Sequence, residues 1–148
     1  MEGSKRCVAT EPASDHCRIM ANRWRDWLDQ AERDLEQAEA SEEDGRHEWA
    51  CFAAHQAAEK AVKALHLYNG QEAWGHLVAS LLAELPSAVE VPSDLEDRGR
   101  VLDNFYVPTR YPNGHPEGAP FEHYGTLQST QALDHARSII DFVRSQVA

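Results

Sequence analysis

The sequence predicts an all-α protein, folded as an antiparallel up-and-down bundle of four or five helices. Apolar residues recur at three- and four-residue spacing in several segments, which is the pattern of a helix with one buried face. No segment shows the sustained alternation of apolar and polar residues that is typical of a strand. Glycine, proline and asparagine separate the helical segments, and short connections of this kind join antiparallel neighbours in a bundle.

The first two predicted helices are long and cover residues 22–44 and 46–68. Gly45 is suited to cap the end of the first helix, because glycine readily adopts the left-handed conformation found there. The second helix is dense in alanine and closes at the turn signal Asn69-Gly70. The apolar stripe of the first helix consists of Trp24, Leu28, Ala31, Leu35 and Ala38.

Two shorter helices are expected next. One covers residues 76–85 and stops before a proline, with its apolar side formed by Leu77, Leu81 and Leu82. The other is predicted to begin at a capping box, Ser93 with Glu96, and to run to about Tyr106.

A long loop and a last helix complete the chain. The loop, residues 107–125, holds four prolines and is expected to be functional because loops of this length are uncommon inside compact domains. The last helix covers residues 126–147 and buries Leu133, Ala136, Ile140 and Val143.

The length of 148 residues suits one domain. Residues 1–20 show no periodicity and are predicted to form a flexible tail, so the bundle is assigned to residues 21–148. The odd number of cysteines, without C-x-x-C spacing, argues against a disulfide framework or a zinc ribbon. Cys7, His16 and Cys17 could hold a metal, but incidental thiols are the favoured interpretation, and no metal or cofactor is predicted.

The chain also carries signals about its location and partners. No stretch approaches the length of a membrane span and the N-terminus lacks the apolar core of a signal peptide, so a cytoplasmic location and no membrane contact are expected. The formal net charge of −11 repels phosphate backbones and disfavours broad nucleic-acid binding. A local basic cleft in a dimer could still overcome this repulsion.

The second helix carries a polar stripe in which Gln56, Glu59 and Lys63 lie on one line with Phe52 and His66. Composition favours a solvated face, stabilised by a Glu59–Lys63 pair four residues apart. Trp49 and Phe52 at one end weaken that interpretation, because aromatic residues are costly to expose, and favour a cleft or a subunit interface.

The loop segment Thr109-Arg110-Tyr111-Pro112-Asn113 is the second candidate. The guanidinium group presents a planar set of donors suited to phosphate or carboxylate. A satisfied surface arginine is the competing interpretation, and the two carry equal weight. Arg110 and His115 also form an R-x4-H spacing, and this residue pair could cleave RNA without a metal, with His115 moving a proton and Arg110 stabilising the charged transition state.

Four motifs in order resemble the HEPN domain family, named for higher eukaryotes and prokaryotes nucleotide-binding. They are AERDL at residues 31–35, FAAHQAAEKAVKAL at residues 52–65, His76-Leu77 at the start of the third helix and RYPN at residues 110–113, and the resemblance covers residues 22–147. A similar RYP-containing domain closes the large eukaryotic protein sacsin. Pro112 after Arg110 and Glu117 where the nuclease branch often has tyrosine make this chain more similar to the non-nuclease branch.

The resemblance implies a homodimer with a cleft between protomers. It implies a nucleotide- or anion-binding module that works with a minimal nucleotidyltransferase in a toxin–antitoxin-like pair. It also places ligand-binding roles on Gln56, Glu59, Lys63, Arg110 and Tyr111. The alternatives are a metal-independent endoribonuclease toxin using Arg110 and His115, with RNA as its ligand, and a helical adaptor that binds proteins without a ligand.

Overall fold

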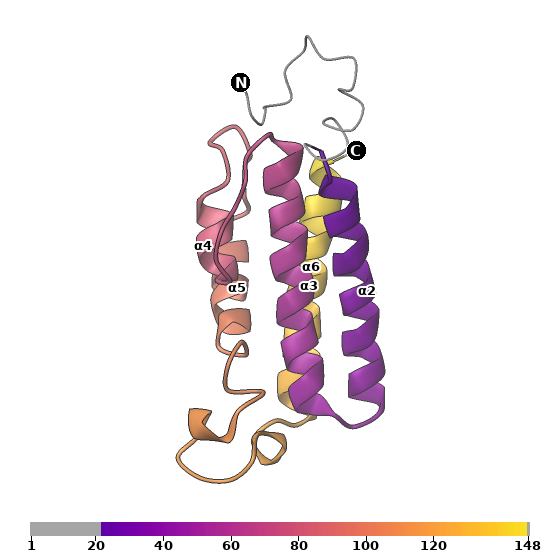
Figure 1. The fold of residues 1–148 in the computed structure, drawn as a ribbon, viewed down its shortest axis with the longest axis vertical. Coiled ribbons are helices and arrows are strands. Elements are labelled where there is room, and N and C mark those ends of the chain that lie inside the picture. The colour runs from indigo at the N-terminus through magenta and orange to yellow at the C-terminus, as the bar shows by residue number, and fades with distance from the viewer. Residues whose placement is uncertain (1–21, 148) are drawn as a thin grey trace, which may run out of the picture.

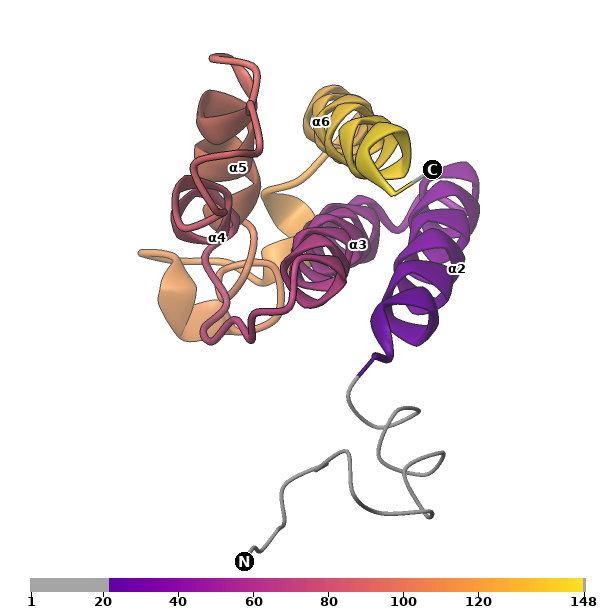
Figure 2. The ribbon, with the colours of Figure 1, turned by 90° about the horizontal axis from the view of Figure 1, so that it is seen from above.

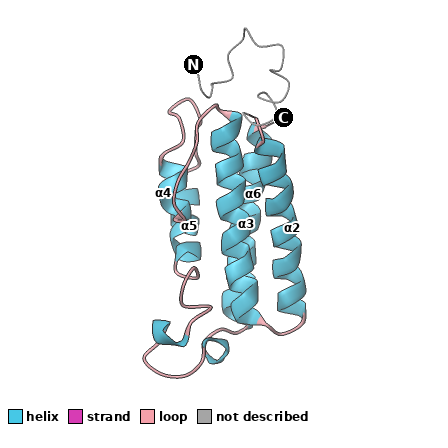
Figure 3. Ribbon diagram, viewed as in Figure 1, coloured by secondary structure: helices cyan, strands magenta, loops and turns pink. Residues whose placement is uncertain are grey.

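A computed structural model describes residues 22–147, and all its regular structure is helical (Figure 3). The elements are α2 (Trp24–Glu43), α3 (His47–Tyr68), α4 (Val78–Ala83), α5 (Leu95–Asp103) and α6 (Thr126–Gln146), with 3-10 turns η1 (Pro112–Gly114) and η2 (Pro120–Glu122). The predicted all-α bundle is therefore confirmed. The predicted tail and the cysteines considered for a metal lie outside the described residues. Within residues 22–147, no helix is both long enough and apolar enough to span a membrane.

α3 is the central helix of the bundle. Seen from above, it lies between α2 and α6 on one side and the α4–α5 pair on the other (Figure 2). α2 and α3 run in opposite directions. The loop segment that carries η1 and η2 lies at the end of the bundle where the chain passes from α2 into α3 (Figure 1).

The sequence of α3 explains its central place. Of its 22 residues, 13 are buried, and seven of these are alanines: Ala50, Ala53, Ala54, Ala57, Ala58, Ala61 and Ala64. Small side chains let neighbouring helices approach closely on several sides. Alanine also has the highest helix propensity, so the helix loses no intrinsic stability through this composition.

Two glycines fix the path of the chain around this core. Gly45 has a φ of 77°, and its N–H bonds to the Glu42 carbonyl 3.0 Å away, which confirms the predicted helix end. Gly99 lies where α5 crosses α4, and a Cβ at this position would be 2.9 Å from the backbone nitrogen of Ala79. The α4–α5 contact thus requires glycine on its α5 side.

The two shorter helices differ from their predicted bounds. α4 begins at Val78, not at residue 76, and Leu77, expected inside, is 52% exposed because it precedes the helix in extended conformation. The Ser93 capping box does not form, since Asp94 is at the N-cap and makes no side-chain capping bond. α5 also ends at Asp103, because the following amides turn to 3-10-type bonds before Pro108.

Candidate functional site

The polar stripe of α3 is not a solvated face. The side chains of Glu59 and Lys63 are 7% and 13% exposed, and the predicted pair forms with Nζ 3.0 Å from Oε2. Gln56 is half-buried and His66 is buried. The solvated interpretation is therefore wrong, and the stripe faces other parts of the protein.

Glu59 is the acceptor at the centre of one cluster. Its Oε2 accepts from Lys63 Nζ at 3.0 Å and from His76 Nδ1 at 3.1 Å. Its Oε1 accepts from Gln56 Nε2 at 3.4 Å. A carboxylate in so little water is stable only where charges and donors compensate it, and these three side chains do so.

A second cluster lies deeper and is closed. His55, fully buried, lies with Nε2 2.9 Å from the His76 carbonyl and 3.2 Å from Asp103 Oδ1. Asp103 also accepts the backbone N–H groups of Val78 at 2.6 Å and Ala79 at 3.1 Å. Asp103 thereby satisfies the first amides of α4, so this cluster holds the fold together.

Tyr106 connects the Glu59 cluster to the loop. Its ring centroid lies 5.0 Å from that of His76, with the planes at 19°, and 6.3 Å from that of Phe52. The guanidinium carbon of Arg110 lies 4.9 Å from the Tyr106 centroid and 4.3 Å from the Phe52 centroid. Arg110 is thus held by cation–π contacts against α3.

Arg110 keeps most of its donors free. Its Nε donates to the Tyr106 carbonyl at 2.9 Å, which fixes the side chain one turn back along the chain. Within residues 22–147, no carboxylate lies at ion-pair distance from this guanidinium. Tyr111, 51% exposed, covers it from outside at 5.3 Å. A half-buried cation without an acid partner is a natural anion site.

His115 has different neighbours. Its Nε2 donates to the Pro108 carbonyl at 2.7 Å, and its ring stacks on His123 with centroids 4.1 Å apart. The segment around it was predicted to be non-helical, but Pro112–Gly114 form the 3-10 turn η1, and His115 follows it in extended conformation. Gly114 packs against Pro108, where a Cβ would come within 2.9 Å of its Cα. These contacts give His115 a clear structural role within the loop.

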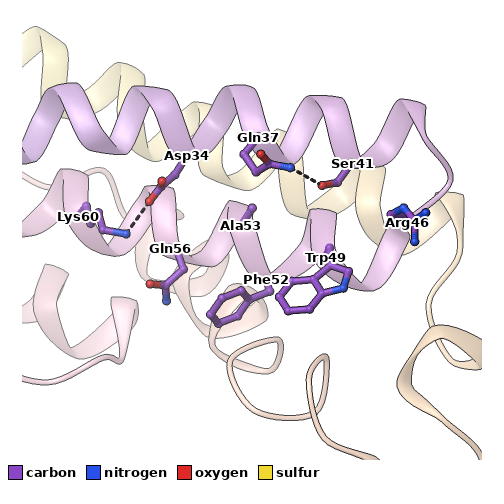
Figure 4. Close-up of a pocket in the computed structure, with 9 residues that line it drawn as sticks. All are labelled: Asp34, Gln37, Ser41, Arg46, Trp49, Phe52, Ala53, Gln56 and Lys60. Carbon is purple, nitrogen blue, oxygen red and sulfur yellow. Dashed lines mark hydrogen bonds and ion pairs between the residues drawn. The ribbon is translucent and has the colours of Figure 1, made fainter.

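A groove of about 490 Å³ lies between α2 and α3, next to the Glu59 cluster, and Gln56 lines it (Figure 4). Phe52 lines the groove and also contacts Arg110, so the groove and the arginine are adjacent. Lys60 crosses to Asp34 within it, and Trp49 stands at its rim with 47% of its surface exposed. The lining residues are Asp34, Gln37, Ser41, Arg46, Trp49, Phe52, Ala53, Gln56 and Lys60.

Neither a metal site nor a reactive cysteine is found among the described residues. Among the described residues, no three His, Cys, Asp or Glu side chains are grouped so as to hold a metal. Burial, followed by the nearby charges of Glu42 and Glu48, raises the pKa of the Cys51 thiol to about 12. Cys51 is therefore unsuited to act as a nucleophile, because its thiolate is scarce at neutral pH.

Comparison with known proteins decides the family. The model of the HEPN domain matches residues 24–146, nearly all of the described chain. This protein belongs to the HEPN family. A search of curated proteins finds no match.

Three solved structures are similar to this HEPN protein. TT1696 from Thermus thermophilus is 52% identical with a TM-score of 0.83, covering 84% of this chain and 98% of its own. ST0689, an archaeal HEPN homologue, is 38% identical with a TM-score of 0.73, over 84% and 98%. A HEPN domain protein from Thermotoga maritima, tm0613, is 36% identical with a TM-score of 0.66, over 82% and 96%.

Sequence reasoning named part of this site. The structure brings Gln56, Glu59 and Lys63 into one cluster and sets Arg110 against the rings of Phe52 and Tyr111. The sequence reasoning missed His76 as a partner of Glu59 and Tyr106 as the link between cluster and loop. His76 belongs to the motifs that resemble the family, but its bond to Glu59 and its contact with Tyr106 did not follow from the sequence, because both contacts join distant parts of the chain.

Proposed function

We propose that this HEPN protein is a nucleotide- or anion-binding module whose phosphate-binding group is Arg110. The observation that carries the proposal is the half-buried guanidinium, held by Phe52 and Tyr106 without an acid partner among the described residues. Prior fixing of the side chain lowers the entropy lost on binding. Tyr111 and Trp49 offer exposed rings for stacking on a base.

The side chains of Gln56, Glu59 and Lys63 bond to one another on α3, beside the Arg110 site. Because Glu59 already neutralises Lys63, we propose that the pair acts by keeping α3 and the loop in register, with Gln56 at the groove wall contacting the ligand.

Calorimetry with ATP and with GTP, in EDTA, tests this function. Arg110→Ala should lose about 1.5–3 kcal/mol of binding free energy, a ten- to hundredfold loss of affinity. Arg137→Ala is the matched control, since it removes an exposed arginine that pairs with Glu39 on α2. Equal affinity of Arg110→Ala and wild type would refute the proposal.

We also propose a homodimer in which two such faces meet at a cleft. Trp27 and Trp49, which are 37% and 47% exposed, support an interface, because large exposed aromatic residues are enriched there. Sedimentation velocity should show that Trp49→Ala weakens the dimer, while Leu127→Ala, which removes an exposed apolar residue from α6, does not. A monomeric wild type at micromolar concentration would contradict the proposal.

A minimal nucleotidyltransferase is the protein partner we propose, on the strength of the family resemblance. Coexpression with a nucleotidyltransferase encoded beside the gene should give a complex that survives gel filtration. Separate elution of the two proteins would remove this part of the proposal.

The ribonuclease alternative requires His115 to accept or donate a proton. Its Nε2 is bonded to Pro108, which leaves only Nδ1 for that task. A gel of single-stranded RNA incubated with the protein in EDTA separates the functions. Intact RNA supports the binding module, and cleavage that is lost in His115→Ala supports the nuclease.

A further inference from the structure

The imidazole of His76 is held through Nδ1, while its Nε2 has no hydrogen-bond partner among the described residues. Its Nδ1 lies 3.1 Å from Glu59 Oε2, and because an ionised carboxylate only accepts, Nδ1 carries the proton of this bond. In the described part of the chain, no side chain or carbonyl bonds to its Nε2. The side chain is 56% exposed, so Nε2 is accessible to a ligand.

The position of His76 relates it to Arg110. Both groups lie against the ring of Tyr106, with the His76 centroid at 5.0 Å and the guanidinium carbon at 4.9 Å. A molecule as large as a nucleotide can therefore reach Arg110 and the edge of His76 together.

The surrounding charges leave His76 responsive to an anion. Glu59 is its only carboxylate partner among the described residues, and the same Oε2 already accepts from Lys63, whose charge balances it. Asp103 lies 3.2 Å from the same His55 Nε2 that bonds to the His76 carbonyl, and its carboxylate also accepts the first amides of α4. The Tyr106 ring stacks on the His76 ring, and His55 bonds to the backbone carbonyl of His76. An anion beside Nε2 would supply the uncompensated negative charge that favours an imidazolium.

We propose that His76 is a ligand-contacting residue of this site and that nucleotide binding there is coupled to proton uptake at its Nε2. In the free protein Nε2 is an acceptor. When a phosphate group binds at Arg110, Nε2 takes a proton from solvent and donates it as a hydrogen bond to a phosphate oxygen. Imidazole is suited to this because it is the side chain that gains and loses a proton between pH 5 and 8. This inference rests on the nucleotide-binding function proposed above.

The test is a titration of the full chain with ATP at pH 7.5, in EDTA, in two buffers of different ionisation enthalpy. The difference in heat between the buffers counts the protons taken up. His76→Asn keeps an amide donor near the position of Nδ1 for Glu59 but cannot be protonated. Protonation of ATP itself is the same for both proteins and cancels. His47→Asn is the matched control, because His47 bonds to Ser129 at the other end of α3.

We expect wild type and His47→Asn to take up the same fraction of a proton, at most about one per ATP, and His76→Asn to take up less while binding about tenfold more weakly. Equal proton counts for wild type and His76→Asn, with ATP bound by both, would overturn the role of His76 and leave the binding function standing. No heat with wild type would overturn both proposals.

A second measurement on the wild-type protein covers the case in which His76→Asn does not fold. Long-range ¹H–¹⁵N spectra should show His76 as the neutral Nδ1–H form in the free protein and as the doubly protonated form with ATP. A His76 ring that remains singly protonated at saturating ATP would refute the proposal.

Discussion

Arg110 and His115 lie five positions apart in one loop, yet their surroundings differ in kind. Arg110 is held by three aromatic rings and one carbonyl, and in the described chain the rest of its guanidinium donors have no hydrogen-bond partner. His115 is bonded through Nε2 to Pro108 and stacked on His123. His115 has one ring nitrogen without a partner in the described chain and is stacked within the loop, whereas Arg110 is oriented and has several free donors, so Arg110 is the better anion-binding group.

The same contrast separates the two clusters around α3. In the deeper cluster, Asp103 and His55 make all their bonds within the fold. In the outer cluster, His76 is bonded on one nitrogen only. Substitutions in the first cluster should therefore change stability, and substitutions in the second should change binding.

Asp103→Ala should have the largest effect. It leaves the N–H groups of Val78 and Ala79 unpaired and removes a partner of buried His55, so we expect the free energy of unfolding to fall by about 3 kcal/mol. Urea denaturation followed by circular dichroism measures this. A loss below about 0.5 kcal/mol would mean that Asp103 does not hold α4.

Gly99→Ala should cost somewhat less, about 1–3 kcal/mol, because its methyl group would meet the backbone of Ala79 at 2.9 Å. The same urea experiment measures this loss. Unchanged stability of Gly99→Ala would show that α4 and α5 separate freely.

Arg110→Lys sharpens the distinction between charge and geometry. Lysine keeps the positive charge but lacks the planar fork and stacks less well on Phe52 and Tyr106. We expect about tenfold weaker ATP binding and a stability change within about 0.5 kcal/mol. Full affinity in Arg110→Lys would mean that the site senses only net charge.

His115→Ala should have the opposite pattern. Loss of its bond to Pro108 should lower the free energy of unfolding by about 1 kcal/mol, while ATP affinity stays the same. A stable His115→Ala variant with lost ATP binding would reverse the roles assigned to the two loop residues.

His135→Gln should have the smallest effect, a change in how the free energy of unfolding depends on pH. Burial, then the charge of Arg98, lowers the pKa of His135 in the folded protein. The unfolded chain therefore binds the proton more readily, and stability is full above about pH 6.5 and declines as pH falls below it. His135→Gln should flatten this decline in urea titrations at pH 7.5, 6.5 and 5.5. A decline of equal slope in the variant would assign it to other groups.

Local patterns predicted the long helices well. The start and end of α3 differ from the expected 46–68 by at most one residue, because alanine density and the Asn69-Gly70 turn act within the helix itself. α6 likewise follows from its apolar spacing, with Leu133, Ala136, Ile140 and Val143 buried as predicted.

The shorter elements and the site depended on distant contacts. Leu77 carried an ordinary helix signal, but α4 begins after it, where the N–H of Val78 bonds to Asp103. Ser93 carried the signal of a capping box, yet the N-cap of α5 is Asp94. Arg110 was named from its residue type and loop. Its pairing with Phe52, 58 positions earlier in the chain, and the role of His76 required the fold.

The central claim is that Arg110, and not His115, meets the ligand. The most direct measurement follows the Arg110 Nε–H signal and the His115 ring signals in one NMR titration with ATP in EDTA. The account predicts that the Arg110 signal shifts and saturates with ATP while the His115 signals keep their positions. Saturating shifts at His115 with an unmoved Arg110 signal would contradict it.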